Sequence, residues 1–203
     1  MEEKIIDQKQ EESSEAKVVK EQWIQFTAVV NHISAAKFIE AVTGAINTGV
    51  EKLNILLSTP GGTVMHGKTV YNFLRSLPVD IEVYNIGQVD SVGGVMFLAA
   101  DKRFAVANSS FLIHGVNLQS PGAISMTEKI VQEKLDGLKQ DRASISMIYA
   151  ERTDISLGDF EKMMLDGITI SVDEAKKFGI IDDIVAPKVP KGSSVISIVD
   201  VIK

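Results

Sequence analysis

The chain has 203 residues, 45% hydrophobic and 24% charged, which is typical of one globular domain with a substantial core. Its net charge of −6 argues against nucleic acid and anionic membranes as partners, because both attract basic surfaces. The absence of cysteine excludes disulfides, thiolate metal ligands and a cysteine nucleophile. Because the sequence has no signal-peptide pattern and no apolar run of about 18–20 residues, the cytoplasm is the expected location.

The first part of the chain predicts strands that alternate with helices. Residues 1–20 are dense in charged and polar side chains and are expected to form a flexible arm in front of the domain. Segments rich in β-branched, aromatic or continuous apolar residues are the predicted strands: 23–30, 53–57 and 81–86. Segments with apolar residues at helical spacing are the predicted helices: 35–48, with Ser34 as its N-cap, and 67–77. This alternation indicates a largely parallel sheet.

Residues 86–114 hold the strongest candidates for chemistry. The preceding strand is expected to end at Gly87, and Ser91 follows at the start of a glycine-rich apolar segment that predicts a buried helix, 92–100. A serine at a strand-to-helix turn is well placed to be a nucleophile, because helix N-terminal amides point at an anion that forms there. The strand-like segment 104–113 then leads to His114, the candidate for its base.

A second glycine-containing turn, residues 58–62, follows the strand before this one. The carboxyl ends of neighbouring parallel strands lie at one edge of a sheet, where sites form. The amides of Gly62 and Val92 are therefore expected to converge beside the Ser91 Oγ as an oxyanion hole. The alternative interpretation is that these glycines only make turns.

The second part of the chain is predicted to be mainly helical. A long helix over 125–152 mixes apolar residues with many charges, so we expect it to project from the sheet or to pack on a neighbouring subunit. Ser171 and Glu174 match a capping box at the start of a short helix. The other predicted elements are helices over 157–164 and 172–178, a strand over 180–185 and an edge strand over 195–201.

Several residues compete for the remaining chemical roles. Asp166, which precedes a glycine and an apolar stretch, is one candidate for the carboxylate that orients the histidine. The other candidates are Asp159, Asp154 and Asp90, of which Asp90 is also expected to be the N-cap of the helix after it. Lys68 and Lys102 are candidates for a serine–lysine mechanism. Three scattered histidines do not indicate a metal site, and no Walker spacing indicates a bound nucleotide.

Four motifs in this order resemble the Clp protease proteolytic subunit, and the resemblance covers about residues 23–185. They are residues 58–62 (STPGG), Gly87 followed by Ser91, residues 108–114 (NSSFLIH) and residues 171–182 (SVDEAKKFGIID). The resemblance implies an α/β fold, a crotonase/ClpP-like spiral of ββα units with a mostly parallel sheet and a projecting long helix. It also divides the chain into the arm 1–20, a peptidase domain 21–187 and a C-terminal extension 188–203.

The family's site residues are carried over motif by motif. Ser91 resembles the nucleophile and His114 the general base of a serine endopeptidase, and Gly62 and Val92 match the positions whose amides form its oxyanion hole. Counted back from Ser171 without a gap, the position of the family's acid falls on Gly167. A one-residue shift assigns it to Asp166.

The resemblance also implies partners. The substrate is a peptide or an unfolded protein, and the assembly is a homo-oligomeric ring, a heptamer or a double ring, with no cofactor and no metal. An AAA+ unfoldase is the family's usual partner, but Asn54 and Leu56 stand where aromatic residues would help to dock it. Two alternative functions are a catalytically impaired structural paralogue and a crotonase-superfamily acyl-CoA enzyme. The second needs a basic cluster for the CoA phosphates, and none stands out.

Overall fold

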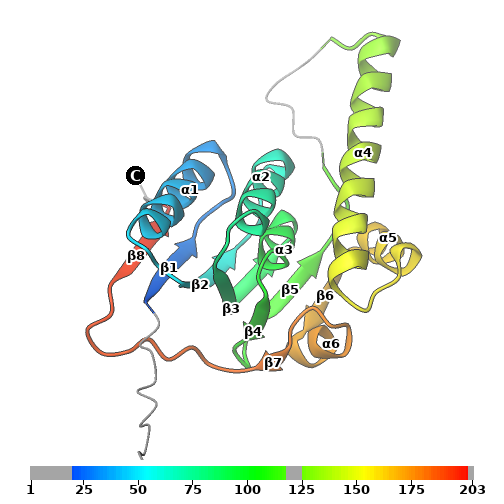
Figure 1. Ribbon diagram of the computed structural model, residues 1–203. Coiled ribbons are helices and arrows are strands. Elements are labelled where there is room, and N and C mark those ends of the chain that lie inside the picture. Colours follow the sequence, from blue (N-terminus) through cyan, green and yellow to red (C-terminus); the bar gives the residue numbers. More distant parts are fainter. Residues whose placement is uncertain (1–19, 118–124, 201–203) are drawn as a thin grey trace, which may run out of the picture.

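The computed structural model describes residues 20–117 and 125–200. The predicted arm lies almost entirely outside these residues, and so does the end of the predicted strand 195–201. An eight-stranded sheet has the order β6-β5-β3-β2-β1-β8, and β4 and β7 extend it beside β3 (Figure 1). All pairings are parallel except that of β5 with β6. The mixed α/β architecture with a mostly parallel sheet is therefore confirmed.

The first three strands and three helices make the body of the molecule. The strands are β1 (Glu21–Thr27), β2 (Lys52–Thr59) and β3 (Asp80–Asp90). The helices are α1 (His32–Asn47), α2 (Val64–Arg75) and α3 (Val92–Phe97), and they cover one face of the sheet (Figure 1). Alternate residues of the strands, such as Ile24, Ile55 and Val83, are buried in the core between sheet and helices.

The N-cap of α1 is Asn31, so the prediction of Ser34 was wrong. The Asn31 side chain accepts hydrogen bonds from the amides of Ile33 and Ser34 at 2.9 and 3.0 Å. The Ser34 hydroxyl in turn accepts a bond from the Asn31 amide at 3.0 Å, which completes a capping box. Ser34 therefore takes part in the cap from inside the helix, which begins three residues earlier than predicted.

The sequence predicted that the third strand ends at Gly87, but the strand continues to Asp90. Its first half pairs with β4 (Lys102–Ala105) and its second half with β5 (Ser110–Ile113). The predicted strand 104–113 is consequently two strands. Gly87 allows β2 to pass closely, because a Cβ there would lie 2.9 Å from the Ser58 Oγ.

The second half of the chain adds a helical arm to one side of the sheet. The long helix α4 (Glu128–Arg152) projects beyond the sheet, as predicted, and only its C-terminal half is buried, at Ile145 and Tyr149 (Figure 1). The elements that follow are α5 (Leu157–Asp166), β6 (Ile168–Ser171), α6 (Val172–Lys177) and β7 (Asp183–Ile184). The capping box of Ser171 and Glu174 is confirmed.

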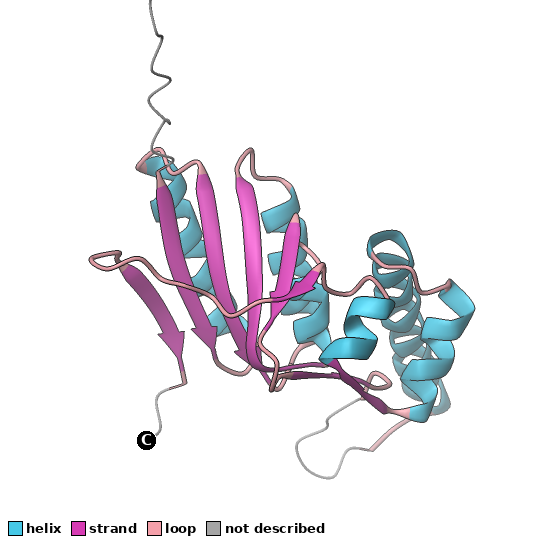
Figure 2. Cartoon of the chain, turned by 90° about the horizontal axis from the view of Figure 1, so that it is seen from below, coloured by secondary structure: helices cyan, strands magenta, loops and turns pink. Residues whose placement is uncertain are grey.

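The last strand, β8 (Val195–Val199), pairs in parallel with β1 at the edge of the sheet. The predicted edge strand is thus confirmed over the described residues. The connection from β7 to β8 crosses the sheet on the face that carries no helix (Figure 2). The C-terminal segment after residue 188 therefore contributes a strand to the sheet of the domain.

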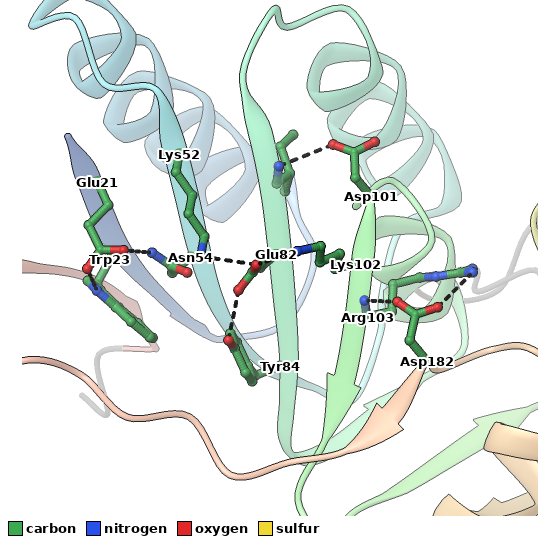
Figure 3. Close-up of polar contacts among 11 residues, drawn as sticks. Glu21, Trp23, Lys52, Asn54, Glu82, Tyr84, Asp101, Lys102, Arg103 and Asp182 are labelled. Carbon is green, nitrogen blue, oxygen red and sulfur yellow. Dashed lines mark hydrogen bonds and ion pairs between the residues drawn. The ribbon is translucent and has the colours of Figure 1, made fainter. Parts of the chain in front are cut away.

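A polar network occupies that helix-free face (Figure 3). Glu82 binds Lys52 at 3.0 Å and accepts a hydrogen bond from the Tyr84 hydroxyl at 2.9 Å. Burial alone would raise the pKa of Glu82, but these two bonds lower it below its ordinary value. On the neighbouring strands, the buried Asn54 amide donates to Glu21 at 2.9 Å. These polar side chains thus satisfy one another within the chain.

Candidate active site

Ser91 stands at a sharp turn between β3 and α3. Its φ is 56°, the one positive value for a non-glycine residue among residues 20–117 and 125–200. Its amide donates a hydrogen bond of 2.7 Å to the Leu112 carbonyl, so the turn is tied to β5. A strained strand-to-helix turn of this kind exposes a nucleophile at the carboxyl edge of a parallel sheet.

A pocket of about 770 Å³ opens in front of this turn. Ser91, His114, Gly62 and Val92 all line it, so the fold brings together four of the five predicted site residues. Apolar side chains from β5, from the segment after it, and from α4 and α5 form its walls. They are Ile113, Val116, Leu138, Ile145, Phe160 and Met164. The pocket therefore combines a candidate nucleophile and base with room for an apolar group.

His114 follows directly after β5 and is half-buried. Its Nδ1 lies 2.7 Å from the Gly115 carbonyl oxygen. Because a carbonyl can only accept a hydrogen bond, Nδ1 must carry the proton in this contact, and Nε2 keeps its lone pair. This is the tautomer that a general base needs. Among the described residues no hydrogen bond joins His114 to Ser91, and such bonds often tighten only when substrate binds.

The backbone around Gly62 leaves one amide free to face the pocket. Val30 pairs with this turn through the Gly61 carbonyl and the Thr63 amide, each at 2.8 Å, and leaves the Gly62 amide out of the pairing. A Cβ at Gly62, whose φ is 150°, would collide with the Val30 carbonyl. Val92 is the first residue of α3, and the first amides of a helix have no intrahelical acceptor. Both amides are thus available to a ligand in the pocket.

Asp166, the fifth predicted residue, is not brought into the pocket. It is the last residue of α5, its side chain is exposed, and within the described residues it has no hydrogen bond to His114. Met164, two residues earlier, does line the pocket, and its carbonyl would lie 3.5 Å from a Cβ at Gly115. The end of α5 therefore lies beside the histidine segment, with its carboxylate turned outward.

Asp90 is not the N-cap of α3, so that prediction was wrong. The N-cap position is Ser91, and it makes no side-chain capping bond. Asp90 is instead buried at the end of β3, where its Oδ1 has no hydrogen-bond partner. Burial raises the pKa of the Asp90 carboxyl, and a backbone hydrogen bond from Leu112 and the nearby His114 partly offset that rise.

The other carboxylate candidates have structural partners away from the pocket. Asp159 accepts a hydrogen bond of 2.6 Å from Ser156 at the start of α5. Asp154 packs on Gly179, where a Cβ would lie 2.6 Å from its Oδ2. Neither residue lines the pocket, so neither is positioned to orient His114.

The two lysine candidates are also engaged elsewhere. Lys68 forms an ion pair of 3.3 Å with Asp141 on α4. Lys102 pairs with Glu82 at 3.5 Å in the polar network of the helix-free face (Figure 3). A serine–lysine mechanism through either of them thus finds no support in the geometry.

Residues of α4 and α5 that no sequence motif had indicated close the pocket. Tyr149 is buried, stacks on Phe160 with ring centroids 3.9 Å apart, and reaches Gly94 of α3. Burial raises the pKa of its hydroxyl. Tyr149 lies four residues after Ile145 and hence on the same helix face, a spacing that could have revealed it.

Two further observations concern other classes of site. In the part of the chain that the structure describes, no three His, Asp or Glu side chains gather as metal ligands would. Over those same residues, none of the helices has the length and apolarity needed to cross a bilayer.

Comparisons with known proteins agree with this architecture. A family model described as Clp protease matches residues 7–188. Among solved structures, the chain is similar to a point mutant of ClpP1 from Listeria monocytogenes. The TM-score is 0.73 at 22% sequence identity, over 82% of this chain and 92% of that one. The fold is therefore of the ClpP/crotonase-like type.

Proposed function

This chain belongs to the Clp protease family, and we propose that it is a serine endopeptidase that hydrolyses peptide bonds through an acyl-enzyme at Ser91. One observation carries the proposal: a serine at positive φ shares a pocket with a histidine and two unpaired backbone amides. These are the nucleophile, base and oxyanion hole of acyl transfer. A protein that only filled a place in an assembly would need none of them.

The proposed reaction follows from these positions. His114 Nε2 takes the hydroxyl proton of Ser91 as its Oγ attacks the peptide carbonyl. The amides of Gly62 and Val92 donate to the oxygen that becomes negatively charged. The tetrahedral intermediate then collapses, the C–N bond breaks and His114 returns the proton to the leaving amine. Water, activated by the same histidine, hydrolyses the acyl-enzyme.

For the third member of the triad, the family motif predicts Asp166. For that residue to act, the end of α5 must turn so that its carboxylate replaces the Gly115 carbonyl at Nδ1 of His114. In the geometry described above, the Gly115 carbonyl by itself fixes the tautomer. The proposal therefore rests on Ser91 and His114. Asp166 is the acid that would join them if the end of α5 turns toward His114.

The proposed assembly is a homo-oligomeric ring that encloses the pocket, with peptides or unfolded chains as substrates and the cytoplasm as its location. The exposed apolar residues of the projecting helix support assembly, since Val131 and Leu135 lie exposed on it. Docking of an AAA+ unfoldase on the helix-free face is not part of the proposal, because Asn54 and Leu56 stand where the family has aromatic docking residues, and Asn54 binds Glu21 instead.

Labelling with a fluorophosphonate probe tests the function. The wild-type chain is expected to be labelled and to cleave an unstructured reporter peptide, whereas Ser91→Ala loses both activities. Ser109→Ala is the matched control, because this buried serine binds the Val106 carbonyl outside the pocket. Labelling that persists in Ser91→Ala would rule out the assigned nucleophile. A folded wild-type protein that is never labelled would favour the impaired paralogue.

The acyl-CoA alternative has a separate test. A crotonase-type enzyme shares the fold and uses paired oxyanion amides, but it does not need a serine beside a histidine. Isothermal titration with acetyl-CoA is expected to give no binding heat. Binding that survives in Ser91→Ala would support the acyl-CoA function instead.

A further inference from the structure

Asp90 is a buried ionisable residue that the proposed reaction does not use. Its side chain is only 9% exposed, and its Oδ1 is buried without a hydrogen-bond partner. A buried carboxylate oxygen that lacks a partner is unfavourable for folding and calls for an explanation. Asp90 directly precedes the nucleophile Ser91, so its charge lies at the site itself.

The strand register places this carboxylate beside the segment that carries the base. Asp90 pairs with Leu112 of β5, and the Ser91 amide donates to the Leu112 carbonyl at 2.7 Å. Burial raises the pKa of the Asp90 carboxyl, and the Leu112 backbone opposes that rise, so the carboxyl lies near β5. His114 is two residues further along, about 7 Å in an extended chain. The carboxylate and the imidazole are therefore neighbours across two adjacent strands.

The other charged groups around His114 do not offer an equivalent negative charge. From α4, Lys134 and Asp141 line the pocket, and Asp141 is neutralised by Lys68 of α2 at 3.3 Å. The Tyr149 hydroxyl of α4 is buried and uncharged, and Asp166 at the end of α5 is exposed to solvent. Burial raises the pKa of Asp90, and the interaction with His114 offsets part of that rise. Asp90 thus supplies the buried negative charge next to the base.

We propose that Asp90 is a positioning residue that stabilises the protonated imidazole of His114 from the adjacent strand, while the Gly115 carbonyl fixes its tautomer. The inference rests on the proposed serine peptidase function and adds a carboxylate that the family motif does not contain. The proton moves only between Ser91, His114 and the leaving amine, and none is transferred to Asp90, which acts in its ionised form. Its charge stabilises the imidazolium that forms when His114 accepts the Ser91 proton in the acylation step.

The pH dependence of kcat/KM for a reporter peptide tests this role. Asp90→Asn is expected to lower kcat/KM on its plateau about tenfold, through kcat rather than KM. Its acidic limb, which follows the deprotonation of His114, should move down by about 0.5–1 pH unit, because an opposite charge favours the protonated form. Asp136→Asn, which removes an exposed charge on α4, should leave the limb in place.

The variant Asp166→Asn distinguishes the effect of Asp166 on the acidic limb from that of Asp90. A shift of the limb in Asp90→Asn supports the proposal, whether or not Asp166→Asn also shifts it. A shift in Asp166→Asn alone overturns the proposal, and so does a lower rate in Asp90→Asn with an unmoved limb. Asp90→Ala should behave like Asp90→Asn. Neither should unfold at neutral pH, because each removes a buried charge whose Oδ1 has no hydrogen-bond partner.

A measurement that needs no turnover keeps the two proposals distinguishable. The chain has three histidines, so NMR can follow the imidazole titration of His114 in the Ser91→Ala background, with His32→Gln and His66→Gln for assignment. The midpoint for His114 should fall by about 0.5–1 pH unit on adding Asp90→Asn. An unmoved midpoint overturns the role of Asp90. If the midpoint falls but the fluorophosphonate probe never labels the wild-type chain, the coupling of Asp90 to His114 is supported and the peptidase function is not.

Discussion

Ser91 adopts a backbone conformation that most side chains avoid, and its surroundings explain why it persists. Its φ of 56° is sparsely populated for a residue with a Cβ. The Leu112 carbonyl holds its amide at 2.7 Å, and Gly61 lies directly against its side chain. Because several contacts fix the turn, the Oγ is presented to the pocket before any substrate binds.

The contact with Gly61 gives a prediction at this scale. A Cβ at Gly61, whose φ is 83°, would lie 2.7 Å from both the Ser91 Cβ and the Asp90 carbonyl. Gly61→Ala is therefore expected to displace the nucleophile and to slow fluorophosphonate labelling about 100-fold. Gly44→Ala is the control, since nothing lies within 4 Å of its added methyl. It should label normally and raise the free energy of unfolding by about 0.5–1 kcal/mol. Wild-type labelling in Gly61→Ala would contradict this account of the turn.

The part of the site that could be predicted from the sequence consists of residues that follow the ends of predicted strands. Ser91, His114 and Gly62 each follow the end of a strand, and parallel strands bring such ends to one edge. Asp166 and Tyr149 depend on how α5 and α4 pack against the sheet. No local pattern specifies that packing, so the carboxylate was assigned by motif and the tyrosine was missed.

Strands and helices were predicted well where local chemistry decides them and poorly where a neighbour does. The capping box at Ser171 is a local signal, and it was confirmed. The break at Gly87 was wrong because glycine usually marks a turn, whereas here it allows the Ser58 side chain to approach a continuous strand. The split of 104–113 into two strands follows from β3 having two successive partners, which a single sequence does not reveal.

The contact between α3 and α4 gives a prediction at the scale of elements. A methyl group at Gly94 would overlap the hydroxyl of the buried Tyr149. Gly94→Ala is expected to lower the free energy of unfolding by about 1–3 kcal/mol, because the tightly packed core leaves no room for the methyl. Tyr149→Phe removes the clashing oxygen, so the double variant should recover much of that loss. Urea unfolding of the four proteins measures this coupling. Strictly additive effects would mean that the two helices do not meet at this point.

At the scale of the whole molecule, the two faces of the sheet are covered in different ways. One face is closed by α1, α2 and α3. The other is crossed by the β7–β8 connection and carries the polar network and the stacked rings of Trp23, Tyr84 and Phe104 (Figure 2, Figure 3). Among the described residues no element covers the projecting half of α4, where Val131 and Leu135 are 51% and 43% exposed. Exposed apolar side chains on a projecting helix favour association. The assembly is therefore proposed to form through α4.

Light scattering coupled to size-exclusion chromatography tests that assembly. The wild-type chain is expected to elute as a ring of many times its 22.1 kDa mass. Leu135→Glu places a charge in the proposed interface, where its desolvation weakens binding, so the assembly should fall apart into smaller species. Gln140→Glu adds the same charge at an exposed polar position of α4 and should keep the assembly intact. A wild-type monomer would contradict the ring. A ring unaffected by Leu135→Glu would move the interface to another element. If the ring encloses the pocket of Ser91, only unfolded chains can reach the nucleophile, so the state of assembly decides the class of substrate.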